Sequence, residues 1–156
     1  MLYKSQIRAA MEFAPLTWGG AAPTHLELLD KVQRRAQRLI FENENESDLD
    51  SLQHRRDVAG LTVMFKIQEL DTEALRPLRQ APRPVPRATR MAAADPLHRA
   101  IKEVRSNTLH HQLQFIPRYS KLWNEFVTTA PEDFVTSSMR GKQPFKNAVH
   151  MWLKTR

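Results

Sequence analysis

Apolar residues recur at helical spacing in several stretches of the chain. The first stretch predicts a helix over residues 2–14, because apolar side chains three or four positions apart share one helical face. Pro15 would end this helix, since proline disfavours helical backbone in the residue before it, and Trp18 to Gly20 would then form a loop. The apolar face would comprise Tyr3, Ile7, Met11 and Ala14.

A second helix of about 16 residues is predicted to begin at Thr24. Thr24 and Glu27 match a capping box, in which the threonine hydroxyl and the glutamate side chain satisfy free N–H groups of the first turn. Two opposed faces follow. The apolar face, expected to be buried, comprises Leu29, Val32, Ala36, Leu39 and Ile40. The basic face comprises Lys31, Arg34, Arg35 and Arg38.

A third helix is predicted over residues 49–70, after an acidic loop, with its start near Ser47 or Asp48. Its middle is apolar nearly all round, which is typical of a helix at the centre of a core or packed on two sides. One apolar face comprises Leu49, Leu52, Ala59, Val63, Ile67 and Leu70, and other directions carry Val58, Leu61, Met64 and Phe65.

The next segment, residues 76–96, predicts a disordered basic linker, because its five prolines favour extended chain and five arginines accompany them. Beyond it the pattern is weaker. We expect a short helix over 97–104 and a possible short strand near Leu109 to Phe115. A helix over 119–127, a loop over 131–143 and a last helix over 145–153 would follow.

These elements predict a mainly α fold. A small bundle of about three helices, residues 1–75, would be joined by the linker at 76–96 to a smaller α-rich segment at 97–156 that includes the possible strand.

Charge narrows the choice of partners. The 156 residues carry a formal net charge of +7 and no cysteine. A basic surplus favours anionic partners such as nucleic acid or acidic membrane, and the lack of cysteine excludes disulfides and thiolate zinc sites. No apolar run approaches the roughly 20 residues of a membrane span, and no signal peptide is recognisable. We therefore expect an intracellular protein, nuclear or cytoplasmic, that is neither secreted nor membrane-bound.

No catalytic constellation stands out, and we expect neither a cofactor, a bound metal nor a small-molecule substrate. Asp48 and Asp50 could chelate Mg²⁺ on a strand, but before a helix they are better explained as capping residues. His110 and His111 are adjacent, so on a strand they would point to opposite faces, which disfavours a shared zinc ion. The three tryptophans are better explained as core residues than as base-stacking platforms.

The basic face of the second predicted helix is the best candidate site. Lys31, Arg34, Arg35 and Arg38 could contact several phosphates along a nucleic acid, or could simply be a solvated helix face. The nearby arginine-rich linker favours an anionic polymer. A membrane-surface helix is less favoured, because the apolar side lacks bulky aromatic anchors. Arg55 and Arg56 are weaker candidates.

Five phrases, in order, resemble the C-terminal part of reverse transcriptases from non-LTR (LINE-type, jockey-like) retrotransposons. The phrases are LYKSQIRAAMEFAPLTW (2–18), HLELLDKVQRRAQRLI (25–40), LQHRRDVAGLTVMFKI (52–67), IPRYSKLWNEF (116–126) and PFKNAVHMWL (144–153). The fourth is similar to an R-x-x-x-L-W-N element of the family, carried here by Arg118, Leu122, Trp123 and Asn124. The resemblance covers nearly the whole chain.

The resemblance implies a position after the polymerase palm, in or beside the thumb, where helices hold primer–template duplex or element RNA. It implies no catalytic residue in this chain. The family's polymerase centre uses an aromatic-x-Asp-Asp turn that binds Mg²⁺, and the sequence has no adjacent pair of aspartates. We therefore expect a catalytically inert fragment of an RNA-directed DNA polymerase. Its helices would contact nucleic acid without sequence specificity, or alternatively dock their apolar faces on a missing palm.

Overall fold

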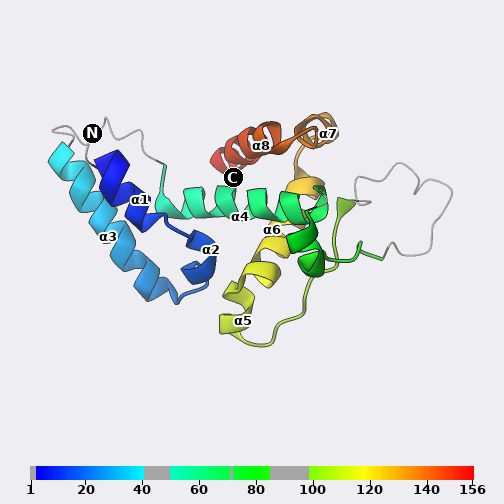
Figure 1. Cartoon of the computed structure of the whole chain (residues 1–156), viewed down its shortest axis with the longest axis horizontal. Coiled ribbons are helices and arrows are strands. Elements are labelled where there is room, and N and C mark those ends of the chain that lie inside the picture. Colours follow the sequence, from blue (N-terminus) through cyan, green and yellow to red (C-terminus); the bar gives the residue numbers. More distant parts are fainter. Residues whose placement is uncertain (1–2, 41–49, 71, 85–98) are drawn as a thin grey trace.

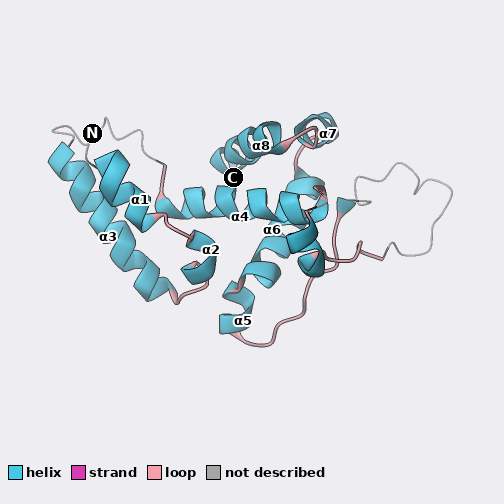
Figure 2. Ribbon diagram, in the orientation of Figure 1, coloured by secondary structure: helices cyan, strands magenta, loops and turns pink. Residues whose placement is uncertain are grey.

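The computed structural model describes residues 3–40, 50–70, 72–84 and 99–156. As predicted, these residues are mainly helical (Figure 2). A long central helix, α4 (Leu52–Gln68), runs through the molecule, with α1 to α3 at one end and the C-terminal helices on either side of it (Figure 1).

The N-terminal stretch is interrupted more than its apolar pattern predicts. A π-helical segment, η1 (Tyr3–Ile7), continues into α1 (Arg8–Met11), and a separate helix α2 (Pro15–Trp18) follows. The break lies at Ala14, whose φ of 44° is left-handed and cannot continue a helix. Pro15 therefore begins a helix rather than ending one, and Trp18 is helical rather than part of a loop.

Helix α3 (Pro23–Ile40) forms where it is expected but starts one residue earlier. The carbonyl of Ala22 accepts from the N–H groups of His25 and Leu26. Thr24 consequently lies inside the first turn and cannot cap it, so the predicted capping box is wrong. Proline suits the first helical position because its fixed φ matches the helix and its missing N–H needs no partner there.

Helix α4 begins at a cap that the sequence pattern places too early. The Ser51 hydroxyl accepts from the N–H of His54 at 3.1 Å, so Ser51, rather than Ser47 or Asp48, is the cap. Residues 41–49 lie outside the described part. The central position expected for this helix is confirmed, because Leu61, Met64 and Phe65 are fully buried.

The described residues after α4 pack against the core. A 3₁₀ helix, η3 (Glu73–Leu78), follows α4, and Pro82 forms an isolated antiparallel bridge with Ile101. The described start of the predicted linker, residues 76–84, is therefore structured, whereas residues 85–98 lie outside the described part. The helix predicted over 97–104 is wrong for its described residues from Ala100 onward, because this stretch pairs in extended conformation.

The C-terminal third is more helical than its pattern suggests. It contains α5 (Leu109–Leu113), α6 (Phe115–Thr129), α7 (Glu132–Ser138) and α8 (Lys142–Thr155). The predicted helices at 119–127 and 145–153 are confirmed within α6 and α8. The predicted strand is instead α5, capped by the Thr108 hydroxyl. The predicted loop contains α7, where two acidic residues in the first turn complement the helix dipole.

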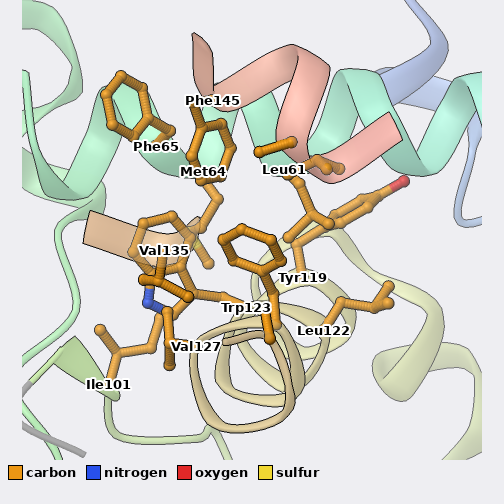
Figure 3. Close-up of a cluster of buried hydrophobic side chains, with 14 of the residues drawn as sticks. Leu61, Met64, Phe65, Ile101, Tyr119, Leu122, Trp123, Val127, Val135 and Phe145 are labelled. Atoms are coloured by element: carbon orange, nitrogen blue, oxygen red, sulfur yellow. The ribbon is translucent and has the colours of Figure 1, made fainter. Parts of the chain in front are cut away.

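One hydrophobic core joins α4 to the C-terminal helices (Figure 3). Phe145 of α8 stacks on Phe65 of α4 with ring centroids 4.5 Å apart, and Trp123 of α6 lies against the same Phe145 ring. The predicted boundary between residues 1–75 and 97–156 therefore does not separate two cores. Figure 3 shows how Leu61, Met64 and Trp123 fill the space between α4, α6 and α8.

Candidate functional site

The four basic residues predicted on α3 lie on an exposed helix face. Lys31, Arg34, Arg35 and Arg38 are all solvent-exposed. Arg34 donates from Nε to the carbonyl of Asp30 in its own helix at 3.4 Å. None of the four forms an ion pair with a carboxylate in the described part of the chain. Among the described residues, these four charges thus face solvent. We call these four residues the basic face.

The inner face of α3 differs from the predicted apolar face. Its buried residue is Gln33, which accepts from Arg55 Nη2 at 2.9 Å and donates to the Asp50 carbonyl at 3.3 Å. Leu29 and Ala36 are half-buried, but Val32 and Leu39 are 48% and 79% exposed. Helix α3 thus meets the rest of the molecule through a polar contact centred on Gln33.

Exposed apolar residues consequently form a row on α3. Leu28, Val32 and Leu39 lie at i, i+4 and i+11, which brings them to one side of the helix. Arg35 occupies the remaining place in this row, at i+7. An apolar row therefore runs directly beside the basic face.

Arg55 and Arg56 serve the fold, which corrects the prediction that they contact nucleic acid. The Arg55 side chain is only 10% exposed, with Nε 2.7 Å from Glu12 Oε1. The Arg56 side chain is 4% exposed, with Nη2 3.7 Å from Asp30 Oδ1, and its guanidinium lies over the Trp18 ring. Burial, opposed by the nearby carboxylates, lowers the pKa of Arg56. Both guanidinium groups fasten the N-terminal helices to α4.

The R-x-x-x-L-W-N element is also structural. Arg118 Nη2 donates to Asp57 Oδ1 at 2.8 Å, which joins α6 to α4. Leu122 and Trp123 are buried in the core. Asn124 holds the extended stretch by accepting from the Ile101 N–H at 2.8 Å and donating to the Ile101 carbonyl at 2.9 Å.

Tyr119 completes this junction. Its hydroxyl donates to the Arg56 carbonyl at 3.2 Å, and its ring lies against Gly60 of α4. Burial, reinforced by the negative charge of Asp57, raises the pKa of Tyr119 well above its ordinary value. The phenol is therefore a neutral packing and hydrogen-bonding group.

A polar cluster that the sequence does not reveal lies where α4 begins. His54 Nε2 lies 2.8 Å from His150 Nδ1, and His150 Nε2 lies 3.9 Å from Asp50 Oδ2. Lys154 Nζ lies 3.3 Å from the other Asp50 oxygen. The two histidines are 96 positions apart and come from α4 and α8, so local spacing carries no signal of their contact.

The electrostatic environment lowers the pKa values of both Asp50 and His54. Burial lowers the pKa of His54, with His150 and Lys154 acting in the same direction and Asp50 opposing. For Asp50, burial acts to raise the pKa, but the hydrogen bond from Lys154 and the histidines outweigh it and lower the pKa. Asp50, His54 and His150 line a pocket of about 460 Å³ together with Arg8, Glu12, Lys142 and Lys146.

The other metal candidates from the sequence are not assembled into such a group. Asp48 lies outside the described residues. His110 and His111 are exposed on the short helix α5, and His110 Nε2 contacts the amide of Gln114 at 3.1 Å.

Among the described helices, none is both long and apolar enough to cross a membrane. Comparison with protein-family models, curated proteins and solved structures finds no match to this chain.

Proposed function

We propose that this chain is a non-enzymatic helical module that contacts nucleic-acid phosphates through the basic face of α3. In this proposal it descends from the thumb-like, post-palm region of a non-LTR retrotransposon reverse transcriptase. Its ligand is an RNA or an RNA–DNA duplex. Such a ligand implies an intracellular location, nuclear or cytoplasmic.

The observation that carries the proposal is the state of the four cations on α3. They are exposed, lie within two helical turns and have no carboxylate partner in the described residues. From Lys31 to Arg38 the basic face extends about 10 Å along α3, so its long side chains can reach neighbouring phosphates of one strand. Four surface cations that pair with no carboxylate of the described residues are suited to an external polyanion.

The expected mode of contact is electrostatic. Arginine forks match phosphate oxygens in pairs, and lysine adds a point charge. Contacts of this kind supply affinity and release counterions, but they do not read the base sequence. The ligand would therefore be selected by its charge and shape.

Descent from a reverse transcriptase is supported by the ordered phrases described above. In the R-x-x-x-L-W-N element, all four defining residues build the junction of α6 with α4 and the extended stretch. A non-enzymatic role is supported by the sequence, which contains no Asp-Asp pair of the kind that binds Mg²⁺ in the family. Magnesium-dependent primer extension by the purified chain would contradict this part.

A direct binding experiment tests the proposal. Lys31, Arg34, Arg35 and Arg38 are changed together to glutamine, and affinity for a labelled RNA–DNA duplex is measured by fluorescence anisotropy. Loss of four phosphate contacts should weaken binding by at least about tenfold, whereas duplexes of different sequence should bind the unmodified chain alike.

The control variant has the same change in net charge, but the changed residues are spread over the surface outside α3. Lys102, Arg105, Lys121 and Arg140 are exposed residues outside α3, and their joint change to glutamine should leave most of the affinity. If both variants bind as the unmodified chain does, or lose affinity equally, the assignment to the basic face is wrong.

The exposed apolar row on α3 favours a second function, docking on the palm region of a polymerase. Large apolar side chains aligned on one exposed face mark interaction surfaces. An isolated chain with such a surface should self-associate in high salt. Light scattering should detect this association, and Leu28→Ser/Leu39→Ser should abolish it. If the unmodified chain is monodisperse in high salt, the docking function is contradicted and contact with phosphates is favoured. By contrast, α4 is not available for such docking, because α6 and α8 already cover it.

A further inference from the structure

We propose that Asp50, His54 and His150 form a binding site for a divalent transition metal of the zinc class, with two imidazole nitrogens and one carboxylate oxygen as ligands. One ligand atom from each residue lies within 4.8 Å of those from the other two. This set of two histidines and one carboxylate suits zinc, and it leaves a coordination position open.

The histidine pair already has nearly the required spacing. Ligand nitrogens about 2.0–2.1 Å from one tetrahedral zinc ion lie roughly 3.4 Å apart. His54 Nε2 and His150 Nδ1 are 2.8 Å apart. An opening of about half an ångström between α4 and α8, or small rotations of the two rings, would admit the ion between the two nitrogens.

The backbone of two ligands is held by neighbouring groups. The Ser51 hydroxyl accepts from the His54 N–H at the start of α4. The Asp50 carbonyl accepts from Arg55 Nη1 and from the Gln33 amide. Positions fixed by such outer contacts lose less freedom when a metal binds.

The carboxylate of Asp50 is oriented in the same way. Lys154 holds Oδ1 at 3.3 Å, which leaves Oδ2 directed toward His150. Lys154 also competes with a cation for this carboxylate, because both are positive. The arrangement therefore predicts that removing the Lys154 charge tightens metal binding.

The site is accessible from solvent. The side chains of Asp50 and His150 are 29% and 35% exposed, and the cluster lies in the pocket that Lys142 and Lys146 also line. An ion bound there would keep an open position toward this pocket. The two lysines would favour an anion as its remaining ligand.

The proposal is tested by isothermal titration calorimetry. The untagged full chain is first treated with a chelator and then titrated with ZnCl₂ in the absence of nucleic acid. We expect one zinc ion per chain. Asp50→Asn and the double variant His54→Gln/His150→Gln should each weaken zinc binding by more than about tenfold. Removing a residue that only contacts a metal ligand already costs at least about tenfold in affinity, so removing a ligand should cost more. CoCl₂ should give visible absorption bands of a tetrahedral complex that the same variants abolish.

Two further variants keep the result interpretable. His110→Gln/His111→Gln removes two exposed histidines from α5 and should bind zinc as the unmodified chain does. Lys154→Met retains all three ligands and should bind more tightly. The proposal is overturned if the unmodified chain takes up no zinc, if the α5 variant loses it equally, or if Lys154→Met has no effect. Because nucleic acid is absent throughout, these outcomes are independent of the basic face.

Discussion

Arg55 and Arg56 show how similar residues in one chain acquire different roles. Both occupy a helix rich in apolar residues, and their side chains find carboxylates on elements that precede it, Glu12 and Asp30. Lys31 and Arg38 instead lie on a helix face that points away from the core. The sequence shows the charge of each residue but not which carboxylates the fold brings near. The basic face could therefore be predicted from helical spacing, whereas the burial of Arg55 and Arg56 could not.

Gly60 provides a test of the packing between α4 and α6. A glycine-to-alanine change in a helix ordinarily stabilises by up to about 1 kcal/mol. Here a methyl group would overlap the Tyr119 ring, so Gly60→Ala should destabilise by about 1–3 kcal/mol. Urea unfolding followed by circular dichroism measures the difference.

Whether Gly60→Ala destabilises or stabilises the fold shows whether the Tyr119 ring packs against Gly60. Gly141→Ala is a comparison without a clash, because its new methyl group would meet only Pro144, at 3.8 Å; since Gly141 is the N-cap of α8, only the cost of alanine at a cap is expected. In the double variant Gly60→Ala/Tyr119→Leu the two costs should be less than additive, since the ring that causes the overlap is gone. Stabilisation by Gly60→Ala alone would show that Tyr119 does not pack against this position.

Asn124 tests the structural reading of the R-x-x-x-L-W-N element. Its amide donates to the carbonyl of Ile101 and to Glu103 Oε1, both at 2.9 Å. Asn124→Asp removes these donors and adds a negative charge beside Glu103, so it should destabilise the fold by about 2 kcal/mol. Thermal or urea unfolding would show this loss.

Asn147 supplies a matched control for the same substitution. It is exposed on α8, and its side-chain oxygen accepts from Gln143, a role that an aspartate can retain. Asn147→Asp should therefore change stability by less than about 0.5 kcal/mol. Equal effects of the two substitutions would contradict the special role of Asn124.

The longer helices α4, α6 and α8 are the elements that the sequence predicts best. Helices α6 and α8 show an amphipathic period, whereas α4 has a long stretch that is apolar nearly all round, and the three helices meet in one core. The elements predicted wrongly are short. Helix α5 has only five residues, too few to display a period, and α7 has two buried side chains, Val135 and Ser138. Helix α5 depends on its Thr108 cap, and α7 depends on packing against its neighbours, rather than on a pattern of their own.

The cluster of Asp50, His54 and His150 could not be predicted from the sequence, for a different reason. Asp50 and His54 are close in sequence, yet His150 reaches them only because α8 packs along α4. A site built from two distant helices can be found only once their packing is known. The sequence therefore predicted no metal ligand among these residues.

The different burial of α3 and α4 leads to a prediction about local stability. Gln33 is the buried residue of α3, whereas most of α4 is buried in the core. Segments with few buried apolar contacts open at lower free energy. Native-state hydrogen exchange should show α3 amides opening at least about 2 kcal/mol more easily than those of α4.

The hydrogen-exchange pattern also shows whether α3 opens by itself or only together with the core. If α3 opens alone, the chain loses its basic face while the core of α4, α6 and α8 stays folded. Equal protection of α3 and α4 would instead mean that the polar contact through Gln33 and Arg55 is as strong as the apolar core, which would contradict the expected order of opening.

At the scale of the whole molecule, the core and the basic face occupy different regions. The C-terminal helices surround α4, and α3 lies at the end of α4 where the N-terminal helices gather (Figure 1). The surface proposed to meet nucleic acid is thus carried by an element that contributes little to the core. Its charges can be changed without disturbing the packing of α4.

The most direct test of this account is the salt dependence of binding to an RNA–DNA duplex, measured between about 50 and 200 mM salt. Four phosphate contacts predict that log K falls against log salt with a slope of about −3 to −4. Changing Lys31, Arg34, Arg35 and Arg38 to glutamine should bring that slope close to zero, whereas the scattered control variant should retain most of it. An affinity that does not change with salt, or an unchanged slope without the basic face, would contradict the account.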